Sequence, residues 1–239
     1  MISIIIPVYN QASELIFALQ AIAQQDYQDY EIIIVNDGSQ DKVENIFADY
    51  YQKINNNQKY LFINQEHKGA PAARNRGLKQ AQGNYLFFHD ADAVLKPNAL
   101  SKMLQALIDN PTASYVYPSF YWGRKLFKVG PFDENKLRSE PYIHTMALIK
   151  KNDFPESAWD ESLKKFQDWD LWLTMLEQGH VGLWVAEVLF TVKPGGTISS
   201  WLPASFYKLF PWLAVVKKYQ RAKKIIQNKH GLLSKTSKI

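Results

Sequence analysis

The alternation of apolar, strand-like runs with helical patterns constrains the fold of this chain more than any other feature. Residues 3–8 form a continuous apolar run, residues 13–25 place apolar side chains at helical spacing, and residues 31–35 form a second apolar run. Continuous apolar runs are typical of strands buried on both faces of a parallel sheet. A strand, helix and strand in succession form a βαβ unit with a right-handed crossover. The sequence therefore predicts an α/β fold with an open, mostly parallel, Rossmann-like central sheet flanked by helices.

Further strands and helices are expected along the chain, and the regular alternation weakens beyond Ala93. A helix begins near Pro71, which suits a first helical turn, and ends near Gly83, since glycine commonly follows the last turn. The other expected elements are strands at 60–63, 85–88, 114–122 and 144–149, a helix at 169–177, and one or two strands at 181–192. No internal repeat or low-complexity linker marks a boundary before about residue 200, so residues 1–200 are expected to form one domain.

The C-terminal segment, residues 201–239, differs from the rest of the chain in charge. It holds nine of the 28 Lys and Arg residues and no Asp or Glu, whereas residues 1–200 carry a net charge of −4. Aromatic and aliphatic residues from Trp201 to Val216 precede a basic run that starts at Lys217. Rings at the level of the lipid headgroups, followed by Lys and Arg near anionic lipid, are typical of a segment that lies on a membrane.

Two interpretations of this basic, aromatic-rich tail remain open. It either contacts an anionic membrane peripherally, or packs its aromatic residues on the body while its lysines are solvated. Pro203, Lys208 and Pro211 interrupt the apolar stretch well short of the roughly 20 residues that a membrane span needs. Nucleic acid is not an expected partner, because no nucleic-acid-binding module accompanies the charge.

Cysteine is absent from the sequence, which excludes disulfides and thiolate metal sites and suits a reducing compartment. The chain enters a strand-like run at Ile2 with no basic region before it, and nothing resembles a cleavable signal. We therefore expect a cytoplasmic location, at the inner face of the cell membrane if the tail binds lipid.

Asp90-Ala91-Asp92 follows directly after the apolar run at 85–88, where a buried strand reaches the surface. The spacing alone is a weak signal, because 13 Asp in 239 residues produce about 0.7 Asp-x-Asp pairs by chance, and a second pair occurs at Asp168 and Asp170. The position is more informative, because ligands of open α/β sheets bind at the carboxyl ends of the strands. Two carboxylates there suit a divalent cation such as Mg²⁺ that also binds substrate phosphates. The alternative is an acidic turn.

Asp37 ends the second predicted strand, within the sequence Asn-Asp-Gly-Ser. Nucleotide-binding sheets commonly place an acid there for a ribose or base, although this sequence also has the composition of a turn. Neither a glycine-rich dinucleotide loop nor a P-loop occurs. Phosphate charge would then be met by a metal and by Lys68, Arg74 or a helix N-terminus. Lys68 and Arg74 are otherwise surface charges.

Asp168 lies at the start of the predicted helix 169–177. A carboxylate in that position can cap the helix and interact favourably with its dipole. The same position exposes it at a cleft, where it could accept a proton from an attacking hydroxyl as a general base.

Five segments, in order along the chain, resemble the motifs of the family 2 inverting glycosyltransferases of the GT-A fold. They are Pro7-Val8-Tyr9-Asn10, Val35-Asn36-Asp37-Gly38-Ser39-Gln40-Asp41, Ala73-Arg74-Asn75-Arg76-Gly77, the stretch from Gly83-Asn84-Tyr85 to Asp90-Ala91-Asp92, and the stretch from Trp159-Asp160-Glu161 to Gln167-Asp168-Trp169-Asp170-Leu171-Trp172-Leu173. Five ordered matches over about 175 residues are more specific than any one motif. The resemblance implies a GT-A domain with a nucleotide-binding half at 1–93 and an acceptor-binding half at 94–200, followed by the tail at 201–239.

The resemblance also implies the donor. Asp37 would contact the base of a nucleoside diphosphate sugar, most often uridine, with Pro7 and Tyr9 beside it. The acceptor would be a hydroxyl of a glycan or a lipid-linked molecule, as in the synthesis of polysaccharides and the cell envelope. The chain would therefore be a metal-dependent hexosyltransferase.

The same resemblance assigns the carboxylates. Asp90 would approach the ribose or the metal, and Asp92 would ligate Mg²⁺ or Mn²⁺, which stabilises charge on the leaving diphosphate. Asp168 would deprotonate the acceptor hydroxyl for in-line attack, inverting the anomeric centre. Two positions depart from the family pattern, which usually has an acid where Ala93 stands and a Glu where Gln167 stands. Both presumed essential carboxylates remain, so a working enzyme is expected.

Residues 193–199 resemble the family's late basic loop near the diphosphate, although its frequent His is missing, and this suggests a role for Lys193. The main rival interpretation is a haloacid-dehalogenase-like phosphatase, in which Asp90 would be the nucleophile. That family normally begins its core sheet with this strand, whereas three strands are expected before it here. A nucleotidyltransferase would need a Gly-rich, basic loop after the first strand, and residues 9–13 offer none. A non-catalytic nucleotide-sugar binder is the remaining alternative.

Overall fold

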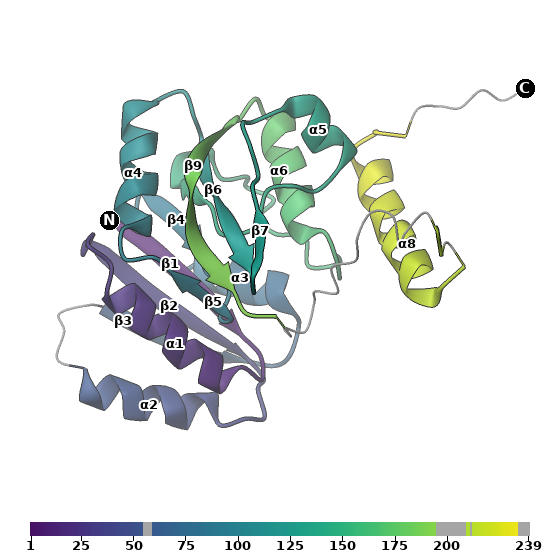
Figure 1. Cartoon of the computed structure of the whole chain (residues 1–239). Helices are drawn as coiled ribbons and strands as arrows, with labels where there is room; N and C mark the ends of the chain where they lie inside the picture. Colours follow the sequence, from purple (N-terminus) through teal and green to yellow (C-terminus); the bar gives the residue numbers. More distant parts are fainter. Residues whose placement is uncertain (55–58, 195–208, 211, 234–239) are drawn as a thin grey trace, which may run out of the picture.

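The computed structural model describes residues 1–54, 59–194, 209–210 and 212–233, and arranges them around a single sheet (Figure 1). The strands run β3-β2-β1-β4-β8-β6-β9-β5, with β7 paired to β6. In chain order the elements are β1 (Ile2–Val8), α1 (Ala12–Ala23), β2 (Tyr30–Asp37), α2 (Val43–Lys53), β3 (Lys59–Gln65), α3 (Ala70–Leu78), β4 (Tyr85–Phe88), β5 (Ala93–Leu95), α4 (Ala99–Asp109), β6 (Tyr115–Trp122), β7 (Lys125–Phe127), α5 (Glu134–Ser139), β8 (Leu148–Lys150), a short 3-10 helix (Lys151–Asp153), α6 (Gln167–Glu177), β9 (Gly182–Val192) and α8 (Ala214–Lys229). The predicted α/β fold class is confirmed.

The strands that precede Asp90 form the parallel part of the sheet. β1 lies between β2 and β4, β3 pairs with β2, and every one of these pairs is parallel. All residues of β1 and β2 are buried, which explains their continuous apolar sequence. Helix α1 connects β1 to β2 and α2 connects β2 to β3, so both crossovers run in one direction along the sheet, whereas α3 connects β3 back to β4 on the other side of β1. Because each connection is right-handed, α3 lies on the face of the sheet opposite to α1 and α2. The carboxyl ends of β1, β2 and β4 therefore meet at one edge of the sheet.

The strands that follow Asp90 pair with mixed polarity. β8 is antiparallel to both β4 and β6, β9 is parallel to β6, and β5 is antiparallel to β9. Trp169 and Trp172 of α6 are fully buried, and Trp172 stacks on Tyr115 of β6 with ring centroids 4.4 Å apart. This packing attaches α6, and with it Asp168, to the mixed part of the sheet.

Helix α3 ends at Leu78 rather than near Gly83 as predicted. Two tight turns follow, because the N–H groups of Gln80 and Ala81 donate to the carbonyls of Gly77 and Leu78. Gly83 serves a different purpose: a Cβ there would lie 2.7 Å from the amide nitrogen of Ser3. Its own N–H donates to the Ser3 hydroxyl at 2.8 Å, so glycine is needed for contact with β1 and not as a helix stop.

Two predicted boundaries in the second half also shift. The strand expected at 144–149 is reduced to β8, and His144 and Thr145 instead face a cavity. Helix α6 begins at Gln167, so Asp168 lies within its first turn instead of capping it. The N-cap is Phe166, which has a left-handed backbone with φ +61°. Among the described residues, the side chain of Asp168 accepts one hydrogen bond only, from the N–H of the next residue, Trp169, at 2.8 Å.

Seven elements lie outside those predicted from the sequence: α2, β5, α4, β7, α5, the 3-10 helix and α8. Helix α4 nevertheless has a clear helical pattern, with Leu100, Met103, Leu104 and Leu107 all buried. The strands β5 and β7 have three residues each, which is too short for a periodic signal.

The described part of the tail forms α8, which lies beside α6 (Figure 1). Val216 and Ile226 of α8 are fully buried, which supports packing on the body for this portion. Residues 201–208 and Pro211 of the predicted membrane segment, and residues 195–199 of the predicted basic loop, lie outside the described residues. Within the described ranges, no helix has both the length and the apolar content of a membrane span.

Candidate active site

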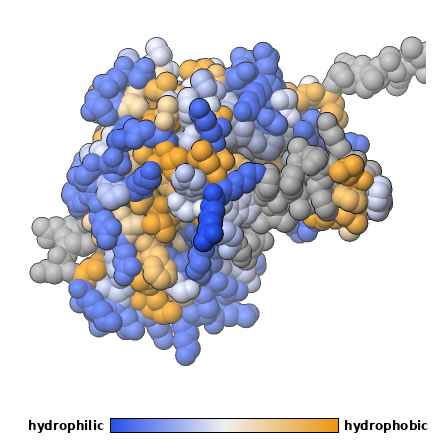
Figure 2. Space-filling model, in the orientation of Figure 1, coloured by the Kyte–Doolittle hydropathy of each residue, from blue (hydrophilic) through white to orange (hydrophobic). Residues whose placement is uncertain are grey.

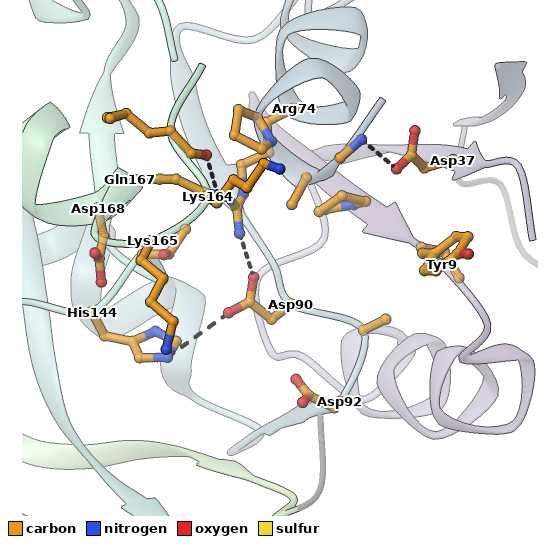
Figure 3. Close-up of a pocket in the computed structure, with 18 of the residues that line it drawn as sticks. Tyr9, Asp37, Arg74, Asp90, Asp92, His144, Lys164, Lys165, Gln167 and Asp168 are labelled. Atoms are coloured by element: carbon orange, nitrogen blue, oxygen red, sulfur yellow. Dashed lines mark hydrogen bonds and ion pairs between the residues drawn. The ribbon is translucent and has the colours of Figure 1, made fainter. Parts of the chain in front are cut away.

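The carboxyl ends of β1, β2 and β4, the loop before α3 and the segment before α6 enclose a cavity of about 790 Å³. All eight residues predicted for the site line this cavity: Pro7, Tyr9, Asp37, Lys68, Arg74, Asp90, Asp92 and Asp168 (Figure 3). The structure thus brings together residues that are up to 161 positions apart in the chain, although their roles do not follow from their proximity alone.

Asp37 fixes the loop that forms one end of the cavity. Its Oδ1 accepts hydrogen bonds from Gln65 Nε2 at 2.7 Å and from the Lys68 N–H at 2.8 Å, and its Oδ2 accepts the Gly69 N–H at 2.8 Å. The ring of His67 lies 2.9 Å from the same carboxylate. The carboxylate is therefore well satisfied by the protein, and Asp37 shapes this end of the cavity through the loop that it holds.

The surface beside this loop is aromatic and basic. The ring of Tyr9 stacks on that of His67 with centroids 3.9 Å apart. The side chain of Lys68 is exposed and faces the cavity, although its amide is bound to Asp37. Gly38 allows the close approach, because its φ is +72° and a Cβ there would lie 2.8 Å from the His67 nitrogen. An aromatic ring and an ammonium group are thus available to a bound nucleotide.

Arg74 connects the two sides of the cavity. Its Nη2 donates to Asp90 Oδ1 at 3.0 Å and its Nη1 donates to Gln167 Oε1 at 3.0 Å (Figure 3). The guanidinium carbon lies 4.8 Å from the centroid of the Trp159 ring, within the range of a cation–π interaction. The guanidinium is thus largely committed to protein partners, which differs from the direct phosphate contact expected from the sequence.

The residue after Arg74 supports the same arrangement. The side chain of Asn75 donates to the carbonyl of Trp159 at 2.9 Å and accepts its N–H at 3.0 Å. It also donates to Glu161 Oε1 at 2.8 Å. Gly77 completes the motif, because a Cβ there would lie 2.5 Å from Ile5 Cγ2 of β1. The motif 73–77 therefore holds α3 against both the sheet and the segment before α6.

Asp90 lies between Arg74 and His144. Burial opposes its ionisation, but the charge and hydrogen bond of Arg74, together with His144, hold the pKa of Asp90 below its ordinary value. His144 Nδ1 accepts the N–H of Met146 at 3.1 Å, so in the neutral ring the proton is on Nε2, which lies 3.8 Å from Asp90 Oδ2. Burial lowers the pKa of His144, and the charges of Asp90 and Asp168 oppose this only in part. Asp90 is therefore ionised beside a neutral imidazole.

Asp92 differs from Asp90 in that no cationic side chain among the described residues pairs with it. Burial and the negative charges of Asp90 and Glu14 raise its pKa to about 6. Within the described residues, no group of three or more His, Asp or Glu side chains could hold a metal ion. A carboxylate of this kind fits an ion that arrives with a diphosphate, since Mg²⁺ usually combines one or two carboxylates with substrate phosphates.

Asp168 faces the cavity from the first turn of α6. Burial raises its pKa, and His144, the Trp169 N–H and Arg74 offset this effect only in part. A carboxylate with a raised pKa and little hydrogen bonding is suited to accept a proton.

Four further cavity residues were not found from the sequence: His144, Lys164, Lys165 and Gln167. They come from irregular segments and from the start of α6, where no periodicity marks them. In the sequence, Gln167 stands out only as a departure from the family pattern. Lys164 and Lys165 were the most detectable, because two adjacent lysines stand three and four residues before Asp168.

The two departures from the family pattern have structural accounts. Gln167 Oε1 accepts from Arg74, as a carboxylate would, while its Nε2 donates to the carbonyl of Leu163 at 3.0 Å. Ala93 is fully buried in β5, where its side chain adds no ligand. Lys193 approaches the site through its backbone, which donates to the carbonyl of Asp92 at 2.9 Å, while its ammonium pairs with Glu14 at 3.1 Å.

A model of the family described as glycosyl transferase family 2 matches residues 3–159. An uncharacterized glycosyltransferase of Rickettsia typhi is 32% identical over 198 residues, which cover 76% of this chain and 60% of the relative. One of Rickettsia prowazekii is 33% identical over 189 residues, covering 72% and 57%. The chain thus spans about three fifths of the length of these relatives.

Solved structures with the same fold include S. aureus TarS 1–349 in complex with UDP-GlcNAc, with a TM-score of 0.68 and 19% identity over 99% of this chain and 74% of that one. The mannosyltransferase PcManGT from Pyrobaculum calidifontis, in complex with GDP-Man and Mn²⁺, gives a TM-score of 0.67 and 18% identity over 97% and 69%. At these identities the likeness shows the fold alone.

Proposed function

The chain belongs to glycosyl transferase family 2, and we propose that it transfers a sugar from a nucleoside diphosphate sugar to a hydroxyl acceptor, with inversion and with a divalent metal. One observation carries the proposal: Asp90 and Asp92 line the same cavity as Asp168, which comes from a different part of the chain. An acidic pair for metal and diphosphate and a separate, sparsely bonded carboxylate are the two components that such a displacement requires.

The donor side is residues 1–93, as the sequence predicts. Tyr9, Pro7 and the loop held by Asp37 offer a surface for the base, and Lys68 offers charge to the phosphates. A uridine nucleotide is the first candidate, on the family resemblance, and TarS is a relative in fold that was solved with UDP-GlcNAc. The cavity volume of about 790 Å³ is in the range of sites for small molecules and cofactors.

Asp92 would hold a Mn²⁺ or Mg²⁺ ion, with Asp90 beside it. The ion, when bound, supplies Lewis-acid stabilisation of the diphosphate leaving group. The residues fit such an ion, because the raised pKa of Asp92 reflects negative charge and burial that a cation would offset. Asp90, held by Arg74, would orient the ribose or the ion from a fixed position.

Asp168 would remove the proton of the acceptor hydroxyl as the oxygen attacks the anomeric carbon. The bond to the diphosphate oxygen breaks as the new glycosidic bond forms on the opposite face, so the configuration inverts. The acceptor would lie in the half at 94–200, where Lys164 and Lys165 also face the cavity.

A panel of UDP-, GDP- and dTDP-sugars with Mn²⁺ or Mg²⁺ tests this function by the release of nucleoside diphosphate. In the same assay Asp168→Asn should lower turnover by a factor of about 10² to 10⁴, while donor and metal binding stay intact. Asp49→Asn, on the exposed face of α2, is a matched control that should be silent. Loss of donor binding in Asp168→Asn would refute the base assignment.

Two results would redirect the proposal. Hydrolysis of p-nitrophenyl phosphate without turnover of any donor would favour the phosphatase, with Asp90 as nucleophile. Tight nucleotide-sugar binding without turnover in the presence of candidate glycan and lipid-linked acceptors would indicate a non-catalytic binder.

We also propose that α8 contacts an anionic membrane at the inner face of the cell membrane, where a lipid-linked acceptor would be found. Figure 2 shows hydrophobic residues at the surface near this helix. Leu209, Trp212 and Ile225 are more than half exposed, and residues 209–233 contain no acidic side chain. An exposed apolar and cationic surface suits anionic headgroups.

Sedimentation with vesicles of phosphatidylcholine and 30% phosphatidylserine, on the order of physiological anionic content, tests the membrane proposal. Trp212→Ser combined with Lys217→Gln and Lys218→Gln should release the protein from these vesicles. Point changes are preferable to deletion of 201–239, because deletion also removes residues that pack on the body. Unchanged sedimentation of the triple variant would reject this contact.

A further inference from the structure

Helix α8 contacts the residues that surround Asp168. The ring of Tyr219 meets that of Phe166 edge to face, with centroids 5.0 Å apart. The ammonium of Lys223 lies 5.9 Å from the centroid of the Trp169 ring. Phe166 caps α6 and lines the cavity, and Trp169 directly follows the predicted base. Contacts from α8 therefore lie on both sides of Asp168 in the sequence.

The end of α8 adds an ionic contact to this packing. Lys229 Nζ lies 2.7 Å from Asp160 Oδ2 and 2.8 Å from Asp170 Oδ1. Asp170 is almost completely buried on α6, two residues beyond Asp168. Asp160 belongs to the segment that precedes α6. One ammonium group thus joins the segment before α6 to α6 itself.

His230 strengthens the hold on α6. Its Nε2 lies 2.9 Å from Asp170 Oδ1 and its Nδ1 lies 2.8 Å from Glu177 Oε1. The side chains of His230 and Asp170 are only 2% and 6% exposed, so their contact is shielded from solvent, whereas Glu177 is partly exposed. The two carboxylates are seven residues apart on α6, and the imidazole therefore braces nearly two turns of the helix.

The segment that contains Asp160 is connected to Asp90 through Arg74. Asp160 is next to Trp159, whose ring supports the guanidinium of Arg74, and Arg74 binds both Asp90 and Gln167. The position of Asp90 and the position of Asp168 are thus linked through Arg74 on one side and through Lys229 on the other. A displacement of α6 would change the distance between the two ends of the site.

Stability alone gives a weak reason for such a cluster. Burying charges costs solvation free energy, and apolar residues of similar volume often stabilise a fold as well or better. The cluster does, however, fix a geometry that apolar packing would leave adjustable. Positioning within less than about 1 Å matters strongly for transfer between bound groups.

We propose that Lys229 and His230 are positioning residues: Lys229 locks α6 to the segment at 159–161, His230 holds α8 on α6, and together they keep Asp168 at the correct distance from the donor. This inference rests on the proposed function. It makes the C-terminal helix a part of the acceptor side of the site, without contact to substrate.

Lys229→Met tests the inference, with Lys229→Arg as the conservative variant and Lys79→Met as a control on the exposed end of α3. Nucleoside diphosphate release should show a kcat about 10-fold lower in Lys229→Met, with the KM for the donor within about twofold of wild type. Lys229→Arg should recover most of the loss, because its guanidinium can reach both carboxylates. Assays run well below the melting temperature of each variant separate positioning from unfolding.

Amide hydrogen exchange provides a second measurement that needs no turnover. Peptides covering 158–172 should exchange faster in Lys229→Met than in wild type, whereas peptides covering 2–10 and 30–40 should not change. Wild-type kcat in Lys229→Met, or unchanged exchange in 158–172, would overturn the positioning role. Absence of turnover in the wild type would instead reject the proposed function, and the exchange experiment would still decide the role of Lys229.

Discussion

The proposed donor side and the proposed acceptor side of the cavity are built in different ways. On the donor side, the Asp37 carboxylate accepts two backbone N–H groups of the loop between β3 and α3, in addition to its contacts with the side chains of Gln65 and His67. On the acceptor side, side chains hold one another: Arg74 binds Gln167, Asn75 binds Glu161, and Lys229 binds Asp170. Backbone contacts depend on the sheet and tolerate many substitutions, whereas side-chain contacts fail when one partner changes. The acceptor side is therefore where single substitutions should alter the reaction most.

Among the residues that support the site, Arg74→Met should have the largest effect, because it breaks the contacts with both Asp90 and Gln167. Removing a buried ion-pair partner leaves Asp90 uncompensated and should destabilise the fold by about 3 kcal/mol. Turnover should fall by about 100-fold, as Asp90 and α6 lose their common anchor. Urea denaturation and nucleoside diphosphate release measure the two effects. Arg74→Lys keeps the charge but not the forked geometry, and equal activity in this control would show that charge alone suffices.

Asp37→Asn should have the next largest effect, and it tests the backbone-held side. The new amide group would face a backbone N–H that now donates to a carboxylate oxygen, at a cost of about 1–3 kcal/mol. The donor KM should rise while kcat changes little, since the loop at 67–69 and not the acceptor side is disturbed. Steady-state kinetics with Asp49→Asn as the matched control measure this split. A fall in kcat at unchanged KM would contradict the division of the site.

The pH dependence of stability should distinguish the α8 contact from the rest of the fold. Burial opposes protonation of His230, but hydrogen bonds and charges of Asp170 and Glu177 outweigh it and raise the pKa above its ordinary value near 6.5. The contribution is therefore fully present below that ordinary value and is lost as pH rises through the raised value. The difference in unfolding free energy between wild type and His230→Gln should shrink from pH 5.5 to pH 9. A difference that grows with pH would reverse the sign and reject the assignment.

Gln167→Glu should have the smallest effect on stability, within about 1 kcal/mol. The new carboxylate would pair more strongly with Arg74 but would lose the bond to the Leu163 carbonyl. Its negative charge next to Asp168 should raise the pKa of that base further, so the acidic limb of the kcat profile should move to higher pH. A pH–rate profile of the variant against wild type measures the movement, and an unchanged limb would argue against Asp168 as the titrating group.

The same contrast explains how much the sequence predicts. The parallel strands and their ends were predictable, because β1 and β2 are buried throughout and each contains a run of apolar residues. The acidic residues at the ends of these strands could therefore be assigned to the site from the sequence. The sequence predicted Arg74 as a site residue but not its hydrogen-bond partners. They lie 16 and 93 residues away in the chain, and no local sequence pattern indicates contacts over such separations.

The site residues and tail contacts that the sequence did not predict have two physical causes. His144, Lys164 and Lys165 stand on irregular segments, where position is set by tertiary contacts and not by a repeat. The tail was open to two interpretations because composition does not reveal that Lys229 and His230 meet carboxylates on α6. Helix α4 is different, because its buried apolar residues do recur at helical spacing in the sequence.

Gly77 allows α3 to pack directly on the sheet, because it has no side chain to separate the two. With Ile5 Cγ2 only 2.5 Å from where a Cβ would stand, even one methyl group would lift the helix and carry Arg74, one turn earlier, away from Asp90. The position of Arg74 relative to Asp90 thus depends on a residue that has no side chain and faces away from the substrate. An engineer who altered the donor or acceptor pocket would have to keep that spacing before any change of specificity could be measured.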